Sequence, residues 1–138
     1  MKFSIQNEKL KQYLAVAVGG ILGALMRETI EMLMRASATD QIPVATLLIN
    51  WVGSFLLAWF YTISIWKYRV PQWVRVGVGT GFIGAFTTFS TFSVESLNLL
   101  QQNIGVGVMY IFSSMLGGFG AIWFGIRLAG EEPEEETI

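Results

Sequence analysis

The residues with the most distinctive chemistry lie in one stretch, GTGFIGAFTTFSTFSVE, at positions 79–95. Its centre, TTFSTFS, intersperses hydroxyl side chains with Phe89 and Phe92. Hydroxyls are neutral hydrogen-bond donors, and the edge of a phenylalanine ring is positively polarised. Such groups can replace the water shell of a small anion without a fixed charge that would trap it, so the stretch suits a narrow, dry anion path. The alternative for the two phenylalanines is ordinary core packing.

The same stretch is poorly suited to a regular helix. Three glycines precede the motif, and Gly, Ser and Thr all have low helix propensity. Inside a bilayer, irregular backbone persists only where protein or a water-filled cavity satisfies its polar groups. The pattern predicts a membrane helix that breaks near residues 84–88 and lines a site or pore. The alternative is an unbroken crossing whose glycines allow close packing and whose hydroxyls bond to their own carbonyls.

Isolated polar side chains occur in two other apolar segments. Asn50 lies in an uncharged run from 44 to 66, and its amide needs a partner either across a helix interface or on a polar permeant. Tyr110 and Ser114 are four residues apart, so they share one helix face. The two side chains could form a polar track along the helix. Alternatively, Tyr110 anchors the helix near the membrane interface and Ser114 packs against a neighbouring helix.

Arg27 lies inside the first apolar segment. A charged side chain at this depth must face protein, water or the polar surface of the membrane. Glu28 and Glu31 are its possible partners, and reaching the interface along the helix is the alternative to a role in a pore.

Composition places the chain in a membrane. The 138 residues are 53% hydrophobic and 14% charged, with a mean hydropathy of +0.53, and so short a chain cannot hide that much apolar surface in a soluble core. The chain contains no cysteine and no histidine, which excludes thiol chemistry, disulfides and histidine-based catalysis. Nothing resembles a nucleophile–base pair, so we do not expect an enzyme.

The expected elements follow from these apolar segments. We predict an all-α membrane protein with a single integral membrane domain over residues 1–138, without a signal peptide. Residues 128–138 form a solvated, disordered acidic tail in this interpretation. The four predicted crossings cover approximately residues 11–34, 44–66, 75–97 and 104–126, the third being broken in mid-membrane.

Basic residues predict the orientation of the four crossings. One side of the membrane would hold both termini and the connection between the second and third crossings. The opposite side would hold only Arg35. The positive-inside rule therefore predicts cytoplasmic termini in a multi-pass protein of the cell membrane. The basic residues on the first side are Lys2, Lys9, Lys11, Lys67, Arg69, Arg75 and Arg127.

Motifs in all four crossings resemble those of the Fluc-type (CrcB) fluoride channels, the fourth through the spacing of Tyr110 and Ser114. The family pattern GxxGGxTTFSTFSxE matches residues 81–95 except at Ala85, where the family has a second glycine. The family pattern GxxGAxxR matches residues 20–27, although Glu28 stands where an aromatic residue commonly follows. T-x-x-x-N-x-x-G matches residues 46–53. The resemblance extends over about residues 13–127.

This resemblance implies a passive, fluoride-selective channel that exports fluoride from the cytoplasm and confers fluoride resistance. It further implies an antiparallel dimer, with a structural sodium ion bound by the backbone carbonyls of Gly84 and Thr87 where two broken helices meet. The fluoride pore residues that it implies are Asn50, Phe89, Phe92, Ser90, Thr91, Glu95, Tyr110, Ser114 and Arg27.

The sequence leaves alternatives open for the dimer partner and for the function. The strong charge bias suggests a dimer with a paralogous subunit of opposite topology, or with itself if insertion both ways remains possible. Fluoride and the lipid bilayer are the other expected partners, and no nucleic acid is expected. The alternatives in function are a small multidrug-type proton-coupled cation transporter and a non-conducting partner subunit of a heterodimeric channel. The first needs a mid-membrane carboxylate, whereas Glu28, Glu31 and Glu95 lie towards the ends of their crossings.

Overall fold

The computed structural model describes residues 2–37 and 42–130, and every element in these ranges is helical. The predicted all-α class is therefore confirmed. In η1 and η2 the helix is of the wider π type, with hydrogen bonds that span five residues. The elements in chain order are α1 (Lys2–Ser37), α2 (Val44–Thr62), η1 (Ile63–Lys67), α3 (Gln72–Arg75), η2 (Val76–Ile83), α4 (Gly84–Phe86), α5 (Phe89–Gln102) and α6 (Ile104–Ala129).

Three of these helices are long and apolar enough to cross a membrane, and the protein is an integral membrane protein on this ground. A further run leads from α3 through η2 and α4 to α5, but its helical conformation is interrupted at Thr87 and Thr88. The candidate spans are Gln6–Met34, Val44–Lys67 and Ile104–Ala129.

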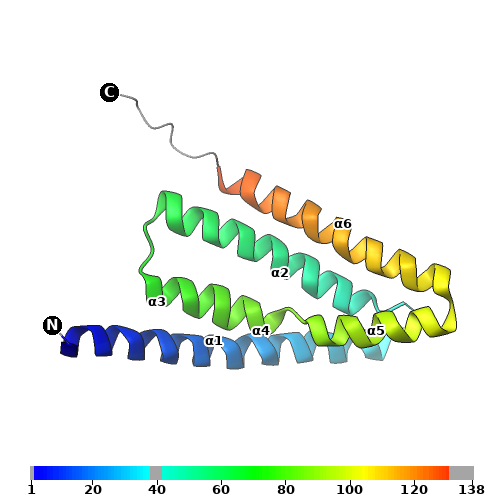
Figure 1. Ribbon diagram of the computed structural model, residues 1–138, viewed down its shortest axis with the longest axis horizontal. Coiled ribbons are helices and arrows are strands. Elements are labelled where there is room, and N and C mark those ends of the chain that lie inside the picture. Colours follow the sequence, from blue (N-terminus) through cyan, green and yellow to red (C-terminus); the bar gives the residue numbers. More distant parts are fainter. Residues whose placement is uncertain (1, 38–41, 131–138) are drawn as a thin grey trace.

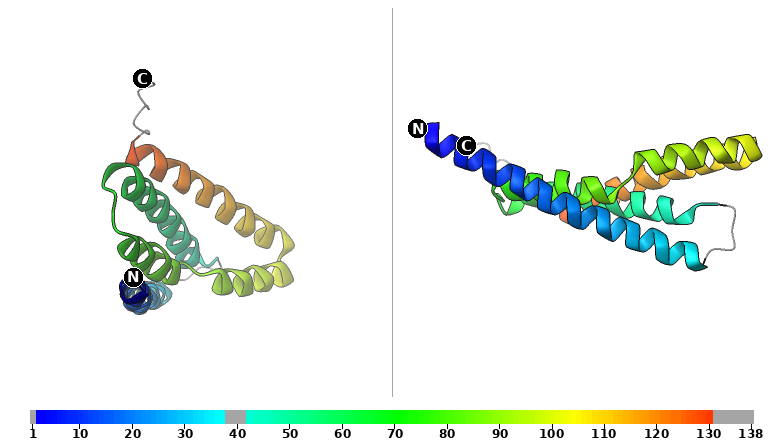
Figure 2. Two further views of the ribbon diagram at one scale, coloured as in Figure 1. Left: turned by 60° about the vertical axis from the view of Figure 1, so that its left-hand side comes forward. Right: turned by 90° about the horizontal axis from the view of Figure 1, so that it is seen from below.

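The long elements lie side by side with alternating directions (Figure 1). The N-terminus, the connection between α2 and α3, and the end of α6 lie at one end of the molecule. α1 packs against α3, η2 and α4, whereas α2 packs mainly against α6 and α5 packs against α6. Seen from below, α5 and the start of α6 diverge from the end of α1 (Figure 2).

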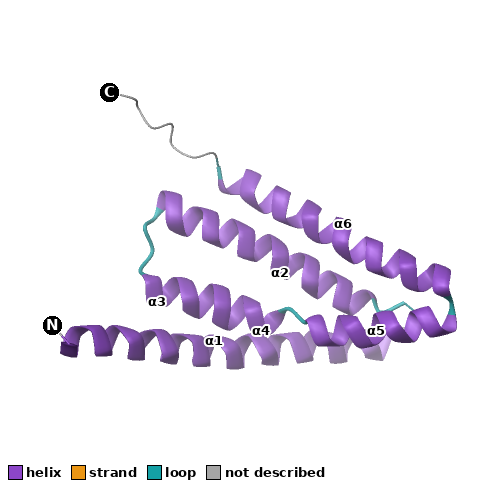
Figure 3. Cartoon of the chain, in the orientation of Figure 1, coloured by secondary structure: helices purple, strands orange, loops and turns teal. Residues whose placement is uncertain are grey.

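Short connections link the later elements (Figure 3). α5 continues to Gln102, past the predicted end of the third crossing at residue 97, and only Asn103 separates it from α6. The Asn103 side chain caps α6, because its Oδ1 accepts from the N–H groups of Gly105 (3.0 Å) and Val106 (3.3 Å). α6 continues to Ala129, so the start of the predicted tail is helical, and residues 131–138 lie outside the described residues.

Glycines allow α1 to contact η2 backbone to backbone. A Cβ at Gly19 would overlap the carbonyl oxygen of Gly77, and one at Gly23 would overlap that of Phe82. From the other side, a Cβ at Gly81 would lie 2.8 Å from the carbonyl oxygen of Val16. Small residues allow this close approach in membrane helices, where packing rather than hydrophobicity drives association.

Apolar side chains cover much of the outer surface. On α1, Leu14 and Ile21 are 58% and 62% exposed, and on α6, Leu116 and Phe119 are 69% and 68% exposed. The buried apolar core of the described residues is correspondingly small, and its main cluster is Leu47, Leu99 and Tyr110, with Trp51, Phe92 and Val106 packed against it. Lipid contact explains this distribution, since hydrocarbon tails solvate apolar side chains that water would not.

Substituting Gly23 by Ala is expected to destabilise the protein. The added methyl group meets the backbone of Phe82, which cannot move away as a flexible side chain could. We expect a loss of about 1–3 kcal/mol, the usual cost of overpacking. The thermal midpoint in detergent, followed by intrinsic fluorescence, measures the effect. Gly20→Ala is the matched control, because its Cβ would lie 3.9 Å from the nearest atom, the oxygen of Gly81. Equal midpoints for the two variants would contradict the packing account.

Candidate functional site

The interruption between α4 and α5 is held by one side chain, that of Asn50 on α2. Its Nδ2 donates to the carbonyl oxygen of Thr88 (3.0 Å), and its Oδ1 accepts from the Thr88 N–H (2.9 Å). Thr87 and Thr88 are both extended, so their backbone groups cannot follow the helical pattern. The amide of Asn50 therefore satisfies both polar backbone groups of Thr88, which would each cost about 1–3 kcal/mol if buried unpaired.

Thr88 also starts the next helix. Its Oγ1 accepts from the Thr91 N–H (3.2 Å), the usual N-cap interaction. The same hydroxyl donates to Thr91 Oγ1 (2.9 Å) and lies 3.4 Å from Ser90 Oγ. Three hydroxyl groups therefore gather on the first turn of α5, where the helix dipole presents its positive end.

Thr87 closes the preceding helix in a different way. Its N–H donates to the Ile83 carbonyl (3.0 Å), and its hydroxyl lies 3.3 Å from the carbonyl oxygens of both Ile83 and Gly84. Its methyl group occupies the space beside Gly53, where a Cβ would overlap it. α2 thus contacts both residues of the interruption, Thr87 through Gly53 and Thr88 through Asn50.

An open pocket of about 320 Å³ lies at this interruption. Its walls come from α2, from the segment between α4 and α5 together with the start of α5, and from α6. Every lining side chain is uncharged, and the polar ones are amide or hydroxyl groups. The lining residues are Asn50, Gly53, Ser54, Leu57, Thr87, Thr88, Phe89, Phe92, Ser114 and Met115.

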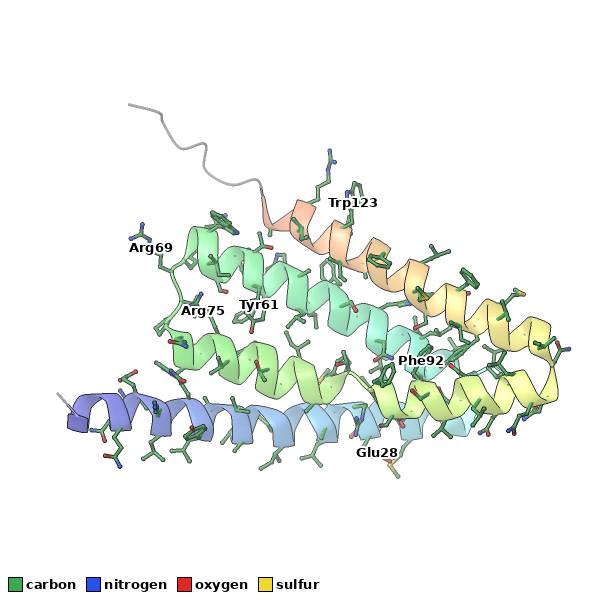
Figure 4. All side chains as sticks on the ribbon, in the orientation of Figure 1. Glu28, Tyr61, Arg69, Arg75, Phe92 and Trp123 are labelled. Atoms are coloured by element: carbon green, nitrogen blue, oxygen red, sulfur yellow. The ribbon has the colours of Figure 1, made fainter. Side chains whose placement is uncertain are left out.

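The two phenylalanines of the motif have different surroundings. Phe92 lies between two rings, with centroids 6.1 Å from Phe89 and 5.6 Å from Tyr110, and points from α5 towards α2 and α6 (Figure 4). Phe89 is 79% exposed at the open side of the pocket. One ring is therefore fixed by the core, and the other has space to move.

A carboxylate lies next to the pocket, beyond Phe92. Glu95 accepts from the Tyr110 hydroxyl (2.8 Å) at Oε2 and from the Thr46 hydroxyl (3.0 Å) at Oε1. Thr46 and Tyr110 are almost completely buried. This three-residue network joins α2, α5 and α6, and it uses both hydroxyl protons to bind the carboxylate.

Arg27 lies outside the pocket. Its Nε is 3.8 Å from Oε1 of Glu31, one turn further along α1, and the Glu31 side chain is buried. Glu28 lies on an exposed face of the same helix (Figure 4). The arginine thus has a carboxylate partner within its own helix.

The predicted site residues fall into three groups. Asn50, Phe89, Phe92 and Ser114 line the pocket, together with the backbone segment that contains Thr87. Ser90, Thr91, Glu95 and Tyr110 do not line it but connect to it through the hydrogen bonds and ring contacts given above. Arg27 and Gly84 lie apart from it.

Sequence reasoning did not predict as site residues Gly53, Ser54, Leu57 and Met115, which line the pocket, nor three further residues that the structure places at the site. Thr46 donates a hydrogen bond to Glu95, and the carbonyl oxygen of Thr88 accepts one from Asn50. Trp51 contacts α6 through a hydrogen bond from its Nε1 to the Ser114 carbonyl (3.3 Å). The spacing of Thr46 one turn before Asn50 was a signal for the first. No local signal distinguishes Thr88 from its hydroxyl neighbours, or Trp51 from a core aromatic residue.

Comparisons with known proteins agree in one assignment. The family model described as CrcB-like protein, Camphor Resistance (CrcB), matches residues 14–126. A protein of Geobacillus kaustophilus named fluoride-specific ion channel FluC 2 is 43% identical over 124 residues, which cover 89% of this chain and 96% of the relative. FluC 1 of Bacillus cereus is 45% identical over 107 residues (77% and 78%), and FluC 2 of Staphylococcus haemolyticus is 38% identical over 121 residues (87% and 98%). With a helix interruption inside its TTFSTFS motif and a family match over most of its length, the chain belongs to the CrcB family.

Proposed function

We propose that this protein is a fluoride-selective channel that exports fluoride from the cytoplasm by passive flow and so confers fluoride resistance. The observation that carries the proposal is the pocket of neutral donors and phenylalanines at the start of α5. The names of the relatives support the same permeant.

The chemistry of the pocket suits a small anion. Fluoride is strongly hydrated, so a path through a bilayer must offer hydrogen-bond donors in place of water. The Asn50 amide and the hydroxyls at the α5 start are such donors. Phe92 and Phe89 add positively polarised ring edges and exclude water. No carboxylate lines the pocket, which argues against the multidrug-type cation transporter.

In the membrane, we propose four crossings, the third being the run from α3 to α5 with its break at Thr87 and Thr88. Irregular backbone at this depth is acceptable because Asn50 satisfies it. The basic residues support cytoplasmic termini in the cell membrane. Arg69 and Arg75 lie at the same end of the molecule as the start of α1 and the end of α6 (Figure 4).

As the functional unit, we propose an antiparallel dimer, formed with a second copy or with a paralogous subunit of opposite topology. The pocket opens on the outer surface of the protomer, and Phe89 is exposed at its rim. A partner would close the path. The charge bias favours a paralogue, and if that paralogue supplied the only conducting path, this chain would be its non-conducting partner.

A structural sodium ion at the carbonyl oxygens of Gly84 and Thr87 is part of this proposal. In a continuous helix the Gly84 oxygen would accept from the Thr88 N–H, but that group bonds Asn50 instead. Gly84 is also exposed on the protomer surface. Carbonyl oxygens are hard ligands at the negative end of a helix, which suits a hard cation.

Liposomes that contain this chain alone are expected to release fluoride rapidly and passively, with little release of chloride. A fluoride electrode and a chloride electrode measure the two rates. Efflux that requires a proton gradient would contradict the channel. If the folded chain is silent, co-reconstitution with a paralogue decides between a missing partner and a wrong assignment, and a silent pair would refute the proposal.

The orientation in the membrane is expected to be fixed. The chain has no natural cysteine, so two single cysteines report on it cleanly: Tyr68→Cys, in the connection that leads from η1 to α3, and Gln102→Cys, at the end of α5. The first connection lies at the end of the molecule that holds the N-terminus, and the end of α5 lies at the opposite end. Both residues are exposed. In intact cells an impermeant thiol reagent should label Gln102→Cys and leave Tyr68→Cys unlabelled until lysis. Equal labelling of both variants would show dual insertion and favour the dimer of identical chains.

A further inference from the structure

The indole of Trp51 links two walls of the pocket without lining it. Trp51 follows Asn50 on α2, and successive helical side chains project about 100° apart, so the two residues face different neighbours. Asn50 binds the interruption at Thr88, whereas Trp51 donates from Nε1 to the carbonyl oxygen of Ser114 on α6 (3.3 Å). Ser114 and Met115 form the α6 wall of the pocket.

Gly117 provides the space for this indole. A Cβ at position 117 would overlap three atoms of the Trp51 ring, Cε2, Nε1 and Cζ2. The neighbouring glycines of α6 have no such role, because a Cβ at Gly118 would lie 4.0 Å from Ser54 Oγ and one at Gly120 would meet nothing within 4 Å. The separation of α2 and α6 beside Ser114 is therefore set where the Trp51 ring packs against Gly117, whereas nearer the end of α6 Gly125 lies against the α2 backbone at Phe55.

The opposite wall is fixed by the same turn of α2. Asn50 holds Thr88, and Gly53 contacts the methyl group of Thr87, just before Phe89 and Phe92. Residues 50–53 of α2 thus contact both walls of the pocket: Trp51 contacts the α6 wall, and Asn50 and Gly53 contact the wall at Thr87 and Thr88. A shift of α6 away from Trp51 would widen the pocket at Thr87 and Thr88, because α2 holds these two residues in place.

We propose that Trp51 is a positioning residue that sets the width of the pocket between Ser114 on α6 and the segment of Thr87 and Thr88, and that it thereby determines the discrimination of fluoride from the larger chloride. The inference rests on the proposed function as a fluoride channel. It assigns selectivity to a contact outside the pocket lining, because neutral donors alone would bind either halide.

The test is the ratio of fluoride to chloride efflux from the same liposomes, which does not depend on the amount of folded protein. Gly117→Ala should lower this ratio about tenfold, because the added methyl group overpacks the Trp51 ring and displaces α6. Trp51→Leu alone should also lower it, since the ring and its hydrogen bond are lost. In the double variant, the smaller leucine makes room for the alanine, and the ratio should return to within about threefold of the wild-type value.

Gly118→Ala is the matched control, since it adds the same methyl group one residue away without a clash, and its ratio should equal that of the wild type. An unchanged ratio in Gly117→Ala would overturn the inference. So would a double variant whose loss is the sum of the two single losses, because contacting residues must be coupled.

A second measurement separates this inference from the proposed function. The chain has five tryptophans, and the indole ¹⁵N–H resonance of Trp51 is assigned by its absence in Trp51→Phe. Gly117→Ala should shift this resonance, and Gly118→Ala should not. A wild-type chain that conducts no fluoride, alone or with a paralogue, would refute the channel, whereas an unmoved Trp51 resonance in Gly117→Ala would refute the role of Trp51.

Discussion

The requirement that every backbone polar group in a bilayer has a partner governs this structure. An α-helix meets the requirement by itself, but the segment at Thr87 and Thr88 does not, because both residues are extended. A single side chain, Asn50, supplies the missing donor and the missing acceptor to Thr88. The rest of the site depends on this pair of hydrogen bonds. Without them, a continuous helix would be the conformation of lowest free energy for this segment in an apolar environment.

The interruption creates two helix ends inside the protein, and their polarities are opposite. α4 ends with carbonyl oxygens that lack their usual partners, and α5 starts with N–H groups and three hydroxyls. Opposite dipole ends favour ions of opposite charge, which is the physical basis of the proposed cation near Gly84 and the proposed anion near Phe89. α2 holds the parts of the site together. Its turn from Asn50 to Gly53 contacts the interruption, and Trp51 in the same turn contacts the wall of the pocket on α6.

Residue types predicted the helical class, the membrane environment and the family, since apolar runs and the TTFSTFS motif are local signals. They also showed that Asn50 needed a partner, but the identity of that partner depends on how α2 packs and could not be read from spacing. The same limit applies to the contact between Thr46 and Glu95, which are 49 residues apart. The α5–α6 connection was predicted to be longer because Asn98, Gln101 and Gln102 are polar, yet α5 includes all three and only Asn103 turns the chain.

The most direct test of this account is the fluoride efflux rate of Asn50→Leu, reconstituted with whatever partner the wild type requires. Leucine has the same branching and the same number of side-chain heavy atoms as asparagine, although it is bulkier, and it can bond neither backbone group of Thr88. The account predicts a folded protein with a rate lowered at least about 10-fold, because both buried polar groups of Thr88 lose their partner. Asn98→Leu, at an exposed position of α5, should keep the wild-type rate. Wild-type efflux from Asn50→Leu would contradict the claim that this one amide maintains the fluoride path.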